Sequence, residues 1–177
     1  MGQSATLYRI SNSTFVQSEN PDTDVSFYIS SAKSNATFEG SFMGIEYVLS
    51  KSLKHLDKEL LSEIFNPTKL IGGENVENMP IEEQFELYEN GSLIPYLDPF
   101  TISKINRLLN EMSEAAIDLN YNSKELNKNG IYPEVWHDDN SADQAFNKRH
   151  LSEDFIELKT IISQAHQEQD YILVFVG

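Results

Sequence analysis

The chain has 177 residues, of which 28 are acidic and 13 are basic, so its formal net charge at neutral pH is −15. A surface of this sign repels phosphate backbones and anionic lipids, which argues against binding to nucleic acids or to membranes. With 40% hydrophobic residues and no cysteine, the sequence predicts one globular domain over residues 1–177, without disulfides or thiolate chemistry.

The first half of the chain predicts short elements separated by polar segments. In chain order, they are a strand at Ser4–Ile10, a short strand at residues 25–29 within a polar stretch, a helix over residues 42–55, a second helix capped by Asp57 and ended before Pro67, a strand at Lys69–Ile71, and a short acidic helix from Pro80 with Ile81, Phe85 and Tyr88 as its buried side chains. The segment from residue 11 to residue 41 carries the weakest pattern.

The second half predicts longer helices and a closing strand. Asp98 and Pro99 fit the cap and first position of a helix, followed at helical spacing by Ile102, Ile105, Leu108, Leu109 and Met112. Next come a short helix over residues 122–129 stopped by Gly130, a long helix over residues 142–167 that includes Phe146 in its buried face, and the apolar strand Tyr171–Val176. The predicted fold class is α+β, with helices packed on a small sheet that includes the N- and C-terminal strands.

Residues 136–139 form the densest group of reactive side chains, a tryptophan and a histidine followed by two aspartates. A histidine beside carboxylates can act as a general base, and loops often carry function. The same residues fit a core anchor followed by a polar turn that caps the next helix. Both interpretations stay open, and the first predicts a binding pocket near Trp136. Its lining residues would be Tyr96, Tyr132, Trp136, His137 and Asp138.

No motif in the chain predicts a metal, a cofactor or a catalytic residue. The four histidines show no metal-binding spacing, and the chain contains no HExxH, GxSxG, P-loop or GxGxxG pattern. Adjacent carboxylates such as Glu82 and Glu83 do not face each other on a helix, so they form no acid–base pair.

An uncompensated acidic segment lies between residues 70 and 103, which contain seven carboxylates and no lysine or arginine. One interpretation is a solvated face, and a second is a docking face for a basic protein. The third is a cation site, although the spacing of the carboxylates matches no known calcium loop. The residues of this predicted docking face are Glu74, Glu77, Glu82, Glu83, Glu86 and Glu89.

Several of these short patterns together resemble the YfbM-like family of small bacterial proteins, a domain of unknown function. The matching features, in order, are Met1-Gly2 before a short strand, an aromatic-rich helix around residues 42–49, Gly72-Gly73-Glu74, the Tyr-Leu-x-Pro at residues 96–99, the Ile-Tyr-Pro-x-x-Trp at residues 131–136, and a closing helix and strand. The likeness covers nearly the whole chain, and it implies a YfbM-like fold without a settled activity.

Three positions depart from the family pattern. The aromatic helix of the family often carries a tryptophan and a histidine where this chain has Phe42 and Glu46, and an arginine often precedes the tyrosine where this chain has Pro95. A family site built from those polar side chains would be altered here.

These observations favour a non-enzymatic, cytoplasmic binding or regulatory domain, for example one that neutralises a basic toxin or nuclease. The N-terminus lacks the basic and apolar regions of a signal peptide, which is the reason for expecting the cytoplasm. The alternative is a small-molecule sensor or enzyme with the pocket near Trp136 and His137. A third interpretation is a structural subunit. Its dimer seam would be formed by Phe27, Tyr28, Phe38 and Phe42.

Overall fold

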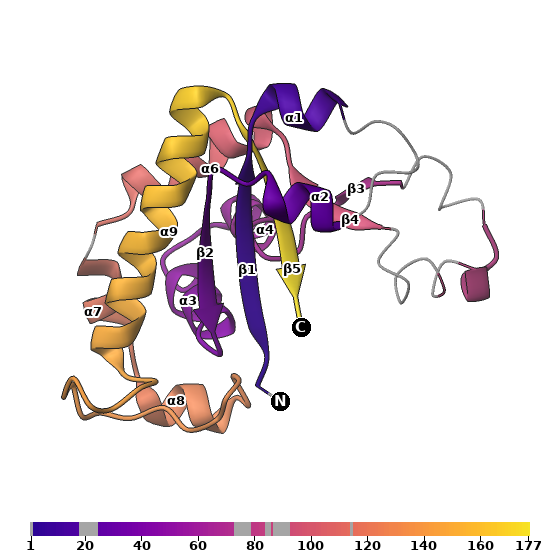
Figure 1. Cartoon of the computed structure of the whole chain (residues 1–177). Helices are drawn as coiled ribbons and strands as arrows, with labels where there is room; N and C mark the ends of the chain where they lie inside the picture. The colour runs from indigo at the N-terminus through magenta and orange to yellow at the C-terminus, as the bar shows by residue number, and fades with distance from the viewer. Residues whose placement is uncertain (1, 18–24, 73–78, 84–85, 87–92, 114) are drawn as a thin grey trace.

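The computed structural model describes residues 2–17, 25–72, 79–83, 86, 93–113 and 115–177 (Figure 1). Its strands are β1 (Ser4–Ile10), β2 (Ser34–Glu39), β3 (Lys69–Ile71), β4 (Ile94–Leu97) and β5 (Tyr171–Val176). Its helices are α1 (Asn12–Gln17), α2 (Val25–Ser30), α3 (Phe42–Ser50), α4 (His55–Ser62), α6 (Pro99–Glu111), α7 (Ala115–Asn120), α8 (Ser123–Lys128) and α9 (Lys148–Glu168). The predicted α+β class, with a sheet that contains the N- and C-terminal strands, is confirmed.

The sheet has five strands in the order β2-β1-β5-β4-β3, and every neighbouring pair is antiparallel. β5 therefore lies in the middle, between β1 and β4. This position explains why Tyr171–Val176 is a continuous apolar run, because a central strand covered by helices on both faces has few positions exposed to water. Ile172, Leu173 and Val174 are each at most 1% exposed.

The two faces of the sheet carry different layers. The face that includes Leu7 and Val174 packs against α3, α4, α6, α7 and α9 and forms the larger core. The opposite face, which includes Ile10 and Leu173, is covered in part by the short helices α1 and α2 (Figure 1). The alternation of side chains along a strand sends neighbouring residues of β1 and β5 to the two layers.

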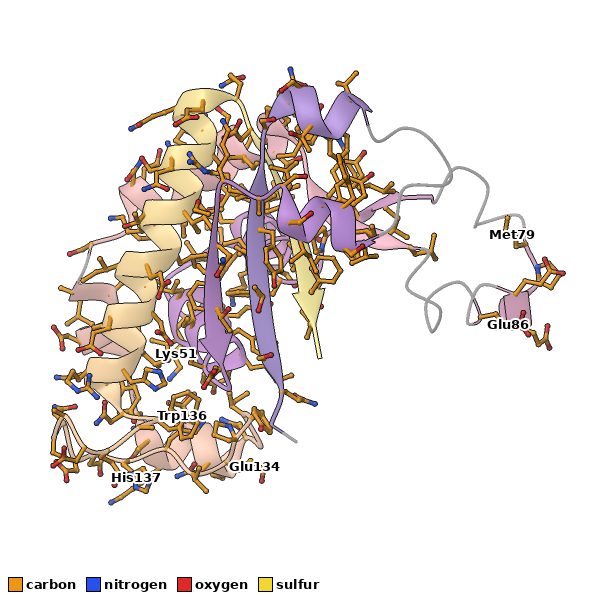
Figure 2. The ribbon with its side chains drawn as sticks, in the orientation of Figure 1. Lys51, Met79, Glu86, Glu134, Trp136 and His137 are labelled. Carbon is orange, nitrogen blue, oxygen red and sulfur yellow. The ribbon has the colours of Figure 1, made fainter. Side chains whose placement is uncertain are left out.

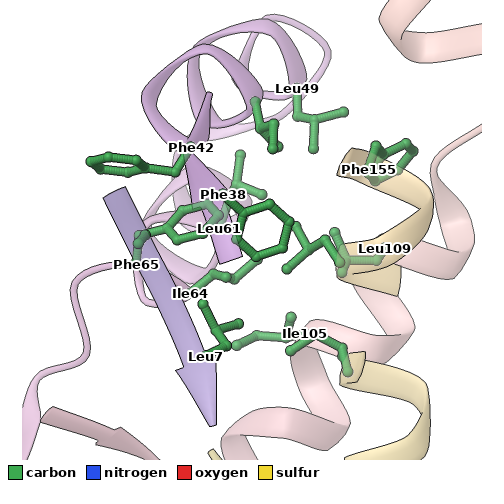
Figure 3. Packing of buried hydrophobic residues seen from close by; sticks show 14 of the residues in the cluster. Leu7, Phe38, Phe42, Leu49, Leu61, Ile64, Phe65, Ile105, Leu109 and Phe155 are labelled. Carbon is green, nitrogen blue, oxygen red and sulfur yellow. The ribbon is translucent and has the colours of Figure 1, made fainter. Parts of the chain in front are cut away.

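Aromatic rings fill the larger core between the sheet and the first helices. Phe38 on β2 and Phe42 on α3 both pack against the Phe65 ring, with ring centroids 5.6 Å apart in each pair (Figure 3). Phe38, Phe42 and Tyr28 are between 0% and 4% exposed. Phe38, Phe42 and Tyr28 are therefore core residues and are not available for a dimer seam. The predicted seam is wrong for these three residues, and Phe27 is the exposed member of the predicted set.

The strand predicted at residues 25–29 is wrong, because Val25–Ser30 is the helix α2. Its β-branched and aromatic residues favour a strand. In the structure, however, Tyr28 is the buried residue of this segment, while Phe27 and Ile29 are 41% and 40% exposed. One buried side chain per turn fits a helix. The second strand is instead β2, whose small and polar residues alternate between buried and exposed.

Several helix boundaries also differ from the predictions. The helix predicted over residues 42–55 ends at Ser50, because a turn closed by the Leu53 amide and the Ser50 carbonyl separates it from α4. Asp57 lies in the first turn of α4, and Lys54 occupies the cap position. The sequence predicts no strand over Ile94–Leu97, which forms β4, whereas the predicted cap of α6 by Asp98 is confirmed.

The last helix begins six residues later than predicted, at Lys148 rather than residue 142. Asn147 caps it by accepting a hydrogen bond from the His150 amide at 2.9 Å. Phe146 is outside the helix and has a positive φ of 54°. The polar turn at residues 138–141 therefore does not cap this helix.

The acidic helix predicted from Pro80 is described only in part. Ile81, predicted to be buried, is 67% exposed, so that prediction is wrong. Phe85 and Tyr88 lie outside the described residues.

Gly44 on α3 allows a close approach between α3 and Trp136 in the larger core. A Cβ atom built at Gly44 would lie 2.3 Å from the Trp136 ring, well inside van der Waals contact. The indole is 3% exposed and thus fills the space that a side chain on this turn of α3 would need. Gly44 is required here for packing.

The position of β5 generates a first prediction. Deleting residues 172–177 removes the middle of the sheet and three side chains whose burial contributes about 1.5–3 kcal/mol each, against a typical total stability of about 5–15 kcal/mol. We expect no soluble, cooperatively melting protein, measured by soluble yield and by thermal melting followed by circular dichroism. Deleting Gly177 alone is the control. A soluble truncation with a cooperative melt would contradict the sheet described here.

The contact at Gly44 generates a second prediction. Gly44→Ala should lower the free energy of unfolding by about 1–3 kcal/mol, because the indole must shift, although alanine favours helix more than glycine does. Met43→Ala, at an exposed position of the same helix, should change it by about 0.5 kcal/mol or less. Urea unfolding measures both. An unchanged or higher stability of Gly44→Ala would refute the close packing of Trp136.

Candidate interaction loop

Trp136 anchors the chain that follows α8. Its indole Nε1 donates a hydrogen bond to the Ile131 carbonyl at 2.8 Å. Its backbone amide and carbonyl are both bonded to the side chain of Asn127, at 2.8 and 2.9 Å. The ring also meets the Phe146 ring edge-on, with centroids 5.8 Å apart. The indole N–H, the backbone amide and the carbonyl of Trp136 thus all have hydrogen-bond partners. The interpretation of Trp136 as a core anchor is confirmed.

Residues 137–147 form a closed loop directly after this anchor, which we call the acidic loop. The His137 amide donates to the Phe146 carbonyl at 2.8 Å, and His137 and Asn147 form a parallel bridge. The Tyr121 hydroxyl donates to the His137 carbonyl at 2.6 Å. A compact loop whose ends meet in this way is an Ω-loop, a type that is frequently functional.

The start of α9 holds the acidic loop from within. The Asn147 side chain donates to the carbonyls of Gln144 and Ser141, at 2.7 and 3.3 Å, while its oxygen caps α9. The Arg149 guanidinium donates to the carbonyls of Ser141, Ala142 and Gln144. The backbone of the loop is therefore fixed without regular secondary structure.

Four carboxylates are exposed on or next to this loop: Glu134, Asp138, Asp139 and Asp143. Asp138 accepts a hydrogen bond from the Ser123 hydroxyl at 2.5 Å, and Asp139 accepts one from the Ser141 amide at 2.8 Å. Within the described parts of the chain, none of the four has a cationic side chain within 4.0 Å. Figure 2 shows Glu134 and His137 near the outer end of the molecule.

Two groups near the loop have shifted pKa values. Burial raises the pKa of Tyr121 to about 12, and the charge of Asp138 adds to the shift. Tyr121 therefore remains a hydroxyl donor to the His137 carbonyl at neutral pH. On α9, burial raises the pKa of Asp154, while the nearby Ser41 hydroxyl and His150 act in the opposite direction.

The residues predicted to line a pocket are not all brought together. Tyr132, Trp136, His137 and Asp138 lie along one segment, and the Tyr132 hydroxyl accepts a hydrogen bond from the Gln3 amide at 3.0 Å. Tyr96 lies elsewhere, on β4. There it packs against Phe15 and Tyr171, with ring centroids 5.0 and 6.1 Å apart. Since the indole is buried, no observation in the described residues supports a pocket lined by Trp136.

An open pocket of about 190 Å³ is found beside Tyr96 instead. It is lined by Leu60, Glu63, Thr68, Lys69, Tyr96, Thr101 and Lys104. Its charges are balanced. The charge of Lys69 is offset by its ion pair with Asp98, and Glu63 offsets the charge of Lys104, the other lysine that lines the pocket. This balance selects for neither an anion nor a cation.

The acidic segment predicted as a docking face is described at three of its six residues. Glu82, Glu83 and Glu86 are exposed, and Figure 2 shows Glu86 and Met79 well away from the sheet. Glu74, Glu77 and Glu89 lie outside the described residues. Sequence reasoning missed the carboxylates of the acidic loop as a second group, because it placed Asp143 inside the last helix.

Two further findings concern the described residues. They include no group of three histidine or carboxylate side chains placed to hold a metal ion. No helix among them is both long enough and apolar enough to cross a membrane.

Comparison with protein families matches residues 1–175 to a domain of unknown function, DUF1877. This agrees with the resemblance to small proteins of unknown function drawn from the sequence. Comparison with curated proteins and with solved structures gives no match. Since the match spans nearly the whole chain, the protein belongs to the DUF1877 family.

Proposed function

We propose that this protein is a non-enzymatic binding domain whose acidic surface binds a basic protein partner. The observation that carries the proposal is the acidic loop, where Asp138, Asp139 and Asp143 are exposed on a backbone held by side chains of α9. Neutralisation of a basic toxin or nuclease is one form that such binding would take.

The two cations that follow the loop along the chain, Lys148 and Arg149, are already engaged. Lys148 pairs with Asp118 at 2.8 Å, and Arg149 pairs with Glu153 in addition to binding the loop carbonyls. Neither of these two side chains therefore forms an ion pair with a loop carboxylate. Carboxylates in this state favour an approaching basic surface and speed its association.

The fixed backbone of the loop supports binding for a second reason. A loop that is already ordered loses little conformational entropy when a partner docks, so more of the interaction energy appears as affinity. The exposed residues Glu82, Glu83 and Glu86 extend the proposal to the acidic segment predicted from the sequence.

The proposal predicts a salt-sensitive partner that depends on the loop. The immobilised protein should capture a basic protein from native host cells at about 50 mM salt and release it at about 500 mM, where exposed charges are screened. Asp139→Asn/Asp143→Asn should weaken this capture by roughly tenfold, because interfacial charge pairs contribute on the order of 1.5 kcal/mol or more. The measurement is the amount of partner retained at each salt concentration.

The control for this prediction is Glu59→Gln/Glu111→Gln, which removes the same number of exposed carboxylates from α4 and α6. It should retain the partner as the natural chain does. Equal losses of captured partner in both double variants would show that net charge alone causes the effect. No loss in either variant would reject the acidic loop as the binding surface. A Glu82→Gln/Glu83→Gln/Glu86→Gln variant tests the acidic segment separately.

A further inference from the structure

The imidazole of His150 lies beneath the acidic loop and connects its closing residue to a buried carboxylate. His150 Nδ1 accepts a hydrogen bond from the Phe146 amide at 3.1 Å, and His150 Nε2 lies 3.3 Å from Asp154 Oδ2. The His150 side chain is 22% exposed and that of Asp154 is 12% exposed. The ring is thus held by one hydrogen bond, from the Phe146 amide, while the buried Asp154 Oδ2 beside it has no hydrogen-bond partner among the described residues.

The hydrogen bond from Phe146 requires a single protonation state of the ring. An acceptor at Nδ1 must carry no proton, so the proton of the neutral imidazole is at Nε2. When the ring gains a second proton, Nδ1 becomes a donor and can no longer accept from the Phe146 amide. The hydrogen bond shown by the structure is therefore incompatible with the imidazolium.

The residue that loses this bond is the one that closes the loop. Phe146 donates to His150 through its amide and accepts from the His137 amide through its carbonyl. Its φ of 54° is in the left-handed region, which a bulky side chain adopts only when its surroundings hold it there. Without the bond to His150, Phe146 loses one of the contacts that hold this conformation.

We propose that His150 is a pH-sensitive switch that closes the acidic loop when its ring is neutral and loosens the loop when its ring is protonated. The charged and titratable groups around the ring come from α9 and from the start of α3. Asp154 lies 3.3 Å from Nε2, Glu153 and Arg149 pair with each other, and the Ser41 hydroxyl at the start of α3 lies beside Asp154. Glu157, further along α9, is close enough to Asp154 for the two charges to interact. From the loop, the Phe146 amide donates to Nδ1.

The switch changes the surface proposed to bind a partner. Acid protonates an imidazole, so the loop is closed while the ring is neutral and loosened once acid has protonated it. Weaker binding of a basic partner in acid is a consequence that rests on the proposed function. The switch itself concerns the free protein and is tested without a partner.

The test is amide hydrogen exchange of Phe146 and His137 by NMR, at about pH 7.5 and about pH 5.5, on either side of the range in which histidine titrates. After correction for the intrinsic exchange rates, we expect both amides of the natural chain to lose about fivefold protection in acid, the factor that one ordinary hydrogen bond contributes. Unchanged protection of both amides would overturn the proposal.

Two variants separate the switch from a general effect of acid. In His150→Asn, the side-chain oxygen takes the place of Nδ1 as acceptor but does not titrate, so protection should be equal at both pH values. His55→Asn is the matched control, because His55 also has a carboxylate four residues later, Glu59 at 3.4 Å, but its side chain is 86% exposed. It should behave like the natural chain. An acid-dependent loss in His150→Asn would show that another group is responsible.

Discussion

The contact between Gly44 and the Trp136 indole determines where the second half of the helical layer meets the first. The ring occupies the space beside Gly44, and most of the residues that follow Trp136 are exposed. Asn127 then fixes the Trp136 backbone from α8, and Phe146 covers the ring edge. The acidic loop begins directly after this anchor, and Phe146, which closes the loop, packs against the indole.

The distribution of charge explains why carboxylates without partners collect at the surface. Several lysines already have carboxylate partners elsewhere in the structure. Lys33 binds Glu168 and the buried Asp170, and Lys69 pairs with Asp98. Lys51 binds Glu125 and the Asn120 carbonyl. A chain with 28 acidic and 13 basic residues then has few cations left to balance the exposed loop. The same loop depends on Arg149, which stabilises its backbone without neutralising Asp139 or Asp143.

Local signals predicted most of the elements that position this site, and long-range packing decided the others. The cap by Asp98, the buried stripe of α6 and the apolar run of β5 have strong local patterns, and each was predicted correctly. Residues 25–29 favour a strand by composition, but the contact of Tyr28 with the sheet places them in a helix. The acidic loop could not be predicted, since its closure depends on Phe146 contacts with His137 and His150. Asn147, a strong capping residue after a polar run, was the local signal for the true start of α9.

Docking of a basic partner on the acidic loop, as proposed above, can be tested on the complex itself. The measurement is amide hydrogen exchange of this protein, by mass spectrometry, with and without the basic protein that it captures from native host cells. We expect slower exchange across residues 137–147 in the complex, with β1 and β5 unchanged. Protection confined to other surfaces, such as α4 and the start of α6, with the acidic loop unaffected, would contradict it.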